Sequence, residues 1–276
     1  MKKPVCLVLL SLAIGLQPLG AQEGYWLKIQ PKAGMEYRFQ NDIHISVENG
    51  GDEPVMTMNM VQSVFSKITA SSTEEVAVVE KLEKIKGSST SMGRTFDFDT
   101  SNPMAGHPTM NAQMEALIGK DAISHIKPNG SFIAGSSPLE SLMGAQSGSS
   151  DFRPLTGNVR FPDYTLKIGD SWTVIDTVLN QGMTNITTTV WTLQGVMDDL
   201  AILSSSGTGT ITGTPPNLPD AKIEGTLAAK GSAKIELSTG VSRESVLKID
   251  AKMNMAYAGQ TQEVTSVTES ASKLLN

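Results

Sequence analysis

Apolar and polar residues alternate with a period of two over long stretches of the chain. The clearest run spans 223–237, where the even positions carry mostly charged or hydroxyl side chains. Its odd positions are apolar or small: Ile223, Gly225, Leu227, Ala229, Gly231, Ala233, Ile235 and Leu237. Successive side chains of a strand point to opposite faces, so this run predicts a strand with one apolar and one solvated face.

Similar runs flank this strand and occupy the first third of the chain. After the turn signal at 238–240 the alternation resumes to Tyr257, and a third strand follows Gly259. Near the start, runs at 35–47 and 56–68 surround a turn at 49–52. Further strands are predicted over Val76–Ile85 and Met92–Phe98. Clean alternation is typical of antiparallel sheets that have one face in water.

We therefore expect a mainly β fold, in which long antiparallel strands form a curved sheet or half-barrel with two short helices inserted mid-chain. A single β-rich domain would span 22–276. Within it we distinguish a β unit at 24–99, a helical insert and linker at 100–158, and a second β unit at 159–275.

The two β units show a faint internal similarity. Lys32–Tyr37 is echoed by Lys167–Trp172, and Glu74–Val79 is echoed by Asp198–Leu203. A shorter match, Val64–Ser66 with Val190–Thr192, lies between them in the same order. The order favours a duplication, although antiparallel strands of similar composition also produce such matches.

Helical patterns occur only between the two units. Met110, Met114, Leu117 and Ile118 follow a helical stripe that Gly119 would end. Ser137–Glu140 forms a capping box that predicts a second short helix through Met143. The Ser/Gly-rich stretch 144–158 is typical of a mobile connection.

The N-terminus predicts export. Lys2 and Lys3 precede an apolar run from Val5 to Leu16, and small residues end at Ala21, so we expect cleavage of a signal peptide at 1–21. The only cysteine, Cys6, lies within this segment and not at its cleavage site, which argues against a lipid anchor. The mature product would be periplasmic or extracellular and free of thiols, which excludes thiol catalysis.

Composition excludes two further classes. The chain carries 22 Lys plus Arg against 28 Asp plus Glu, and no basic run occurs, so nucleic acid is not an expected partner. After the N-terminal run, no apolar stretch has the roughly 18 residues of a transmembrane helix. Aromatic residues make up only 5%, and Lys248, Asp250 and Lys252 lie on one strand face, which disfavours an outer-membrane barrel.

The order of short motifs resembles a family of exported bacterial proteins that is classified as a domain of unknown function. The motifs run from a signal peptide through Lys-x-Gly-x-x-Tyr, a methionine-rich strand and Phe-Asp-Phe-Asp, and continue after the helix with Leu117–Lys120, Pro128–Gly130, Phe161–Pro162 and Lys167–Trp172. The resemblance spans the mature chain. It implies export and a β-rich fold, and it implies no catalytic residue.

The residues themselves predict no catalytic, cofactor-binding or metal-binding site. His44 shares a strand face with Asp42, Ser46 and Glu48, which indicates a solvated position. His107 falls in a loop and His125 in a short strand. No two histidines have chelating spacing, and neither a zinc-protease motif nor a phosphate-binding loop is present. We expect a protein that is not an enzyme and needs no cofactor.

The fourteen methionines are the most unusual feature. Met56, Met58 and Met60 alternate along one strand, as do Met253 and Met255 along another. Thioethers bind Cu(I), but these methionines continue the apolar phase of their strands. Packing, or lining a cavity for a varied ligand, is therefore the favoured interpretation.

Two functional hypotheses remain from the sequence. The favoured one is a non-enzymatic binding protein whose curved apolar face holds a hydrophobic small molecule or lipid. The lipoprotein carriers of the cell envelope contain half-barrels of this kind, which is an analogy of fold alone. The alternative is a structural or protein-interaction module with an envelope protein as its partner and no small-molecule ligand.

Overall fold

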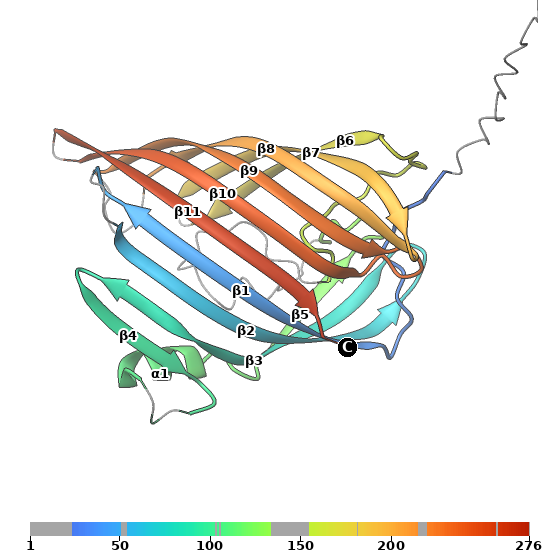
Figure 1. The fold of residues 1–276 in the computed structure, drawn as a ribbon, viewed down its shortest axis with the longest axis horizontal. Coiled ribbons are helices and arrows are strands. Elements are labelled where there is room, and N and C mark those ends of the chain that lie inside the picture. Colours follow the sequence, from blue (N-terminus) through green and yellow to red (C-terminus); the bar gives the residue numbers. More distant parts are fainter. Residues whose placement is uncertain are drawn as a thin grey trace, which may run out of the picture.

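Antiparallel strands form one sheet in the computed structural model, which confirms the predicted fold class (Figure 1). The structure describes residues 24–50, 54–102, 104, 106–133, 155–180, 182–214, 220–257 and 259–275. The predicted signal peptide and the predicted helix at 137–143 lie outside these residues.

The strands are long for a globular protein, most of them having 13 to 18 residues. Their bounds are β1 Glu36–Glu48, β2 Pro54–Ser71, β3 Val76–Ser91, β4 Arg94–Asp99, β5 Asp121–Ile126, β6 Ser171–Asn180, β7 Met183–Met197, β8 Leu200–Gly213, β9 Lys222–Glu236, β10 Ser242–Tyr257 and β11 Gln260–Leu274. One helix, α1, spans Pro108–Glu115 within the described part of the chain.

The strand order is β4-β3-β2-β1-β11-β10-β9-β8-β7-β6. The short strand β5 lies on the same side of β3 as β4, and it pairs with the first residues of β3, whereas β4 pairs with the last ones. Along the main strand order, neighbours in the sheet are neighbours in the sequence except at one position, where β1 pairs with β11 from Phe39↔Leu274 to Glu48↔Thr265. This ladder joins an N-terminal meander to a C-terminal meander. The sheet curves but does not close, because β6 and β4 end the order without pairing with each other (Figure 1).

We call the face that carries Phe39 the inner face and the opposite one the outer face. At one end of the strands, inner-face residues from both meanders meet in a buried cluster that includes Phe39, Trp191 and Leu203. The segments 25–29 and 155–166 pack into this cluster and cover it. Trp172 donates a hydrogen bond from Nε1 to the carbonyl of Arg160 (2.7 Å), which fastens the second segment to β6.

A second buried cluster lies under β2, β3 and β4. It contains Val64, Leu82, Ile85 and Phe98, and Met114 of α1 packs against it. In Figure 1, α1 lies beside β3 and β4, at the edge of the sheet. The helix therefore covers only one margin of the inner face.

Three boundaries differ from the sequence predictions. The strand predicted to end at Ile85 continues to Ser91, because Met92 and Gly93 form the tight turn with positive φ before β4. The predicted helical stripe ends at Glu115 and is followed by a turn up to Gly119. In the stretch 144–158, the described residues 155–158 form a turn in which Leu155 packs in the first cluster, and the rest of the predicted connection lies outside the described residues.

The hairpins that open the two β units have the same construction. The amide of Gly34 donates to the carbonyl of Ile68, and the amide of Gly169 donates to that of Leu193. Both glycines have positive φ, and both partner strands shift register within two residues of the contact. Thus the two echoed Lys-x-Gly motifs occupy equivalent positions at the starts of β1 and β6.

Candidate functional site

The inner face continues beyond the two buried clusters as an apolar surface that is only half-buried. We call its central part the apolar strip, formed by two rows of side chains that cross β2, β1 and β10. Its residues are Ile43, Ile45, Met58, Met60, Leu247 and Ile249. All are partly accessible except Met60, which is buried. Ser270 and Thr268 of β11 lie between the β1 and β10 members.

A row of polar side chains separates the apolar strip from the first buried cluster. This polar row consists of Gln62, Asn41, Ser272 and Ser245, which lie opposite one another on β2, β1, β11 and β10. Asn41 and Gln62 are fully buried, and Ser272 is 9% exposed. Neither amide atom of Asn41 has a hydrogen-bond partner. A buried polar group without a partner costs about 1–3 kcal/mol, so this arrangement is energetically unfavourable.

The methionines singled out in the sequence lie on the inner face in two separate places. Met56, Met58 and Met60 alternate along β2, whereas Met253 and Met255 alternate along β10. Two strands, β1 and β11, lie between them. At a strand spacing of about 4.8 Å, the two groups are too far apart to bind one metal ion together. Their positions agree with the predicted apolar face.

The outer face has a hollow of about 800 Å³ near the middle of the sheet. One row of directly opposed residues crosses it on six strands: Asp97, Ser88, Asn59, His44, Glu269 and Lys248. His44 donates a hydrogen bond from Nδ1 to Oδ1 of Asn59 (2.7 Å), and Lys248 donates from Nζ to Oε1 of Glu269 (3.0 Å). The hydrogen bond and charge of Lys248 hold the pKa of Glu269 below its ordinary value.

The outer hollow therefore presents paired charges to solvent. Lys248 and Glu269 are both about half exposed, so water and salt screen their interaction. Among the described residues, no group of three or more His, Cys, Asp or Glu side chains is arranged to hold a metal ion. His44 lies on this solvated face, as its strand phase predicts.

The other two histidines lie in different parts of the structure. The ring of His107, at the N-terminus of α1, packs edge-on against Phe96 at 5.0 Å. Nδ1 of His125, on β5, is hydrogen-bonded to Oε1 of Glu75. The structure therefore brings no two of the three histidines together.

Glu80 is a buried carboxyl group that the sequence analysis missed. It lies on the inner face of β3, where Oγ of Ser66 donates a hydrogen bond to it (3.4 Å). Burial raises the pKa of Glu80 to about 7. Both Glu80 and Asn41 interrupt the apolar phase of their strands, and this interruption was the signal available in the sequence.

Sequence comparisons assign no family. No family model matches the chain, and no curated protein matches it. No helix within the described ranges has both the length and the hydropathy needed to cross a membrane.

Comparison with solved structures yields weak similarities to channel proteins. A "CymD monoaromatic hydrocarbon channel" is 9% identical with a TM-score of 0.26, over 88% of this chain and 89% of that one. A variant of the Rh. blastica porin is 8% identical with a TM-score of 0.22, over 87% and 99% of the two chains. OmpT, an outer membrane protein of Vibrio cholerae, is 10% identical with a TM-score of 0.19, over 90% and 99%. TM-scores this low support no argument about function.

Proposed function

We propose that the protein is an exported, non-enzymatic binding protein that holds a hydrophobic small molecule or lipid against the apolar strip. The observation that supports this most directly is the partial exposure of Ile43, Ile45, Leu247 and Ile249 on the inner face. A solid core would bury these side chains completely. Each leaves apolar area in contact with water, and covering that area with an apolar ligand is favourable by about 25 cal/mol per Å².

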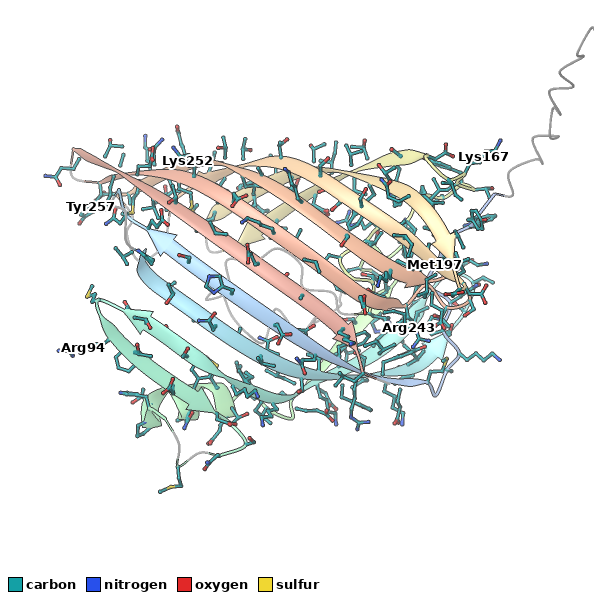
Figure 2. All side chains as sticks on the ribbon, viewed as in Figure 1. Arg94, Lys167, Met197, Arg243, Lys252 and Tyr257 are labelled. Atoms are coloured by element: carbon teal, nitrogen blue, oxygen red, sulfur yellow. The ribbon has the colours of Figure 1, made fainter. Side chains whose placement is uncertain are left out.

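The two faces of the same strands differ in a way that favours the inner one. On β10, Leu247, Ile249 and Ala251 point inward, whereas Lys248 and Lys252 point outward. Figure 2 shows Lys252 extending from the outer surface of the upper strands. No inner-facing residue in the two rows of the apolar strip is ionisable. An uncharged chain is thus the ligand that this surface accommodates without an unpaired charge.

Flexible side chains suit such a ligand. Met58 lies within the apolar strip, and Met56 extends it along β2. An unbranched thioether adapts to ligands of different shape at little energetic cost. This property agrees with a site that accepts a class of related molecules.

The test is to express the full chain with its leader, purify the exported product and extract it with organic solvent. We expect its mass to lack residues 1–21 and mass spectrometry of the extract to show a bound lipid-like molecule. We also expect the neutral probe N-phenyl-1-naphthylamine to fluoresce more strongly on binding and to be displaced by long-chain lipids. An empty extract together with no probe binding would refute the proposal.

A second candidate function, protein interaction, is favoured by one observation. Large apolar side chains lie exposed on the outer face of β6 and β7, at the end of the strand order: Ile175 (65%), Leu179 (78%), Ile186 (43%) and Val190 (39%). Exposed apolar side chains gathered on one surface often mark a protein interface.

If this surface binds a protein, the double variant Ile175→Lys plus Leu179→Lys should abolish co-purification of the partner from envelope extracts. Because both side chains are exposed, we expect the free energy of unfolding to change by less than about 0.5 kcal/mol. Val246→Lys, at another exposed apolar position (52%) on β10, is the matched control. Unchanged co-purification in the double variant would contradict this second function.

A further inference from the structure

Asn41 is the most unusual polar residue on the inner face. Its side chain is completely buried, and neither its Oδ1 nor its Nδ2 has a hydrogen-bond partner. It alternates with Phe39 and Ile43, which both point inward, so it belongs to the same face as the apolar strip. A leucine, which branches at the same carbon atom, would occupy this position without an unsatisfied polar group. An asparagine here therefore calls for a role beyond packing.

The place of Asn41 in the sheet indicates that role. The row on one side of it contains Phe39, Val64 and Leu274 and is fully packed. The row on the other side contains Ile43 and Leu247, both partly accessible. Successive rows on one face are about 7 Å apart, since each residue advances the strand by about 3.4 Å. An apolar chain that lies on the strip and runs along the strands would thus bring its end within one row, about 7 Å, of Asn41.

The residues around Asn41 indicate which chemical group at the end of a ligand can bind there. In its row and in the adjacent row of the apolar strip, no inner-facing residue of the paired strands is ionisable. A charged head group would have no counter-ion there, and burial of an unpaired charge is very costly. The amide of Asn41 offers one acceptor and one donor group, so it is complementary to a group that both donates and accepts.

We propose that Asn41 binds the uncharged polar end of an amphiphile, such as the hydroxyl of a long-chain alcohol or of a monoacylglycerol, while the hydrocarbon chain lies on the apolar strip. This inference rests on the proposed binding function and narrows it to a ligand class. Ser272 and Ser245, in the same row, extend the polar surface available to a head group with more than one hydroxyl. The ligand would satisfy the amide of Asn41, which has no hydrogen-bond partner within the protein.

The experiment compares 1-decanol with decyl methyl ether, which keeps the oxygen acceptor but has no donor. Each compound displaces N-phenyl-1-naphthylamine from the wild-type protein and from Asn41→Leu, and the ratio of the two displacement concentrations is recorded. In Asn41→Leu we expect the preference for the alcohol over the ether to fall by about tenfold. A change of this size corresponds to the loss of one buried hydrogen bond. Asn254→Leu, on the outer face of β10, is the control and should keep the wild-type ratio.

The outcomes separate the two proposals. If the probe binds wild-type protein but Asn41→Leu leaves the ratio unchanged, the role of Asn41 is refuted and the binding function stands. If the probe binds neither protein, the binding function itself fails. Asn41→Ala, which introduces no additional volume, gives a second measurement of the same ratio should the leucine disturb folding. An unchanged ratio in a folded Asn41→Ala protein would equally overturn the inference.

Discussion

Ile249→Glu should abolish binding of the hydrophobic ligand, with at least a tenfold loss of affinity for N-phenyl-1-naphthylamine. Ile249 belongs to the apolar strip and lies on the inner face of β10, opposite Thr268 of β11. A carboxylate at this position would have to lose its hydration when a ligand covers it, and no cationic side chain in its row is present to pair with it. The measurement is a fluorescence titration of the purified variant, together with mass spectrometry of its organic extract.

The matched control lies three residues away on the same strand. Val246 is 52% exposed and lines the outer hollow beside Lys248, so Val246→Glu introduces the same charge on the opposite face. We expect it to bind the probe like the wild type. Loss of binding in Val246→Glu with retention in Ile249→Glu would place the ligand in the outer hollow and contradict the proposed site.

Glu80→Gln should remove a large part of the pH dependence of stability. Burial raises the pKa of Glu80 to about 7, whereas in the unfolded chain it returns to an ordinary glutamate value near 4.5. Between these two pH values the unfolded chain releases a proton that the folded chain retains. The free energy of unfolding of the wild type therefore falls as pH rises from 4.5 to 7, by roughly 3 kcal/mol for this single group.

Urea unfolding at pH 4.5 and pH 8 measures this effect. Glutamine cannot ionise, so Glu80→Gln should gain roughly 3 kcal/mol relative to the wild type between the two pH values. Glu83→Gln, on the same strand, replaces a carboxylate that is exposed and paired with Arg38, and it serves as the control. A constant difference between Glu80→Gln and the wild type at both pH values would show that this carboxyl group does not remain protonated in the fold.

The strands could be predicted from the sequence, because the exposure of one sheet face to water determines the alternation of polar and apolar residues. The run at 223–237 became β9 and the run after Gly259 became β11, since water on one side of a sheet enforces alternation. The pairing of β1 with β11 could not be predicted, because it joins residues more than 200 positions apart and no local signal encodes it. This pairing joins the inner faces of the two meanders into one face.

The candidate site was predictable only as an apolar face. Alternation indicates which side chains avoid water, and it identified Ile43, Ile45 and Ile249 correctly as one-sided. It does not indicate how completely they are covered, which depends on the segments at 25–29 and 155–166 that pack elsewhere on that face. Asn41 could not be predicted as a site residue, because single polar residues often interrupt the apolar positions of a strand. Its significance appears only when burial and hydrogen bonding are known.

The ladder between β1 and β11 has a consequence for the order of folding. Every other neighbouring pair on the main strand order is a hairpin that closes over a short loop, so the two meanders can form independently and early. The β1–β11 ladder closes a loop of most of the described chain, so we expect it to form after the hairpins. Since the apolar strip has members on both sides of this ladder, the ligand-binding surface is completed only in that later step. A ligand that spans the ladder would therefore contact both meanders and favour their pairing.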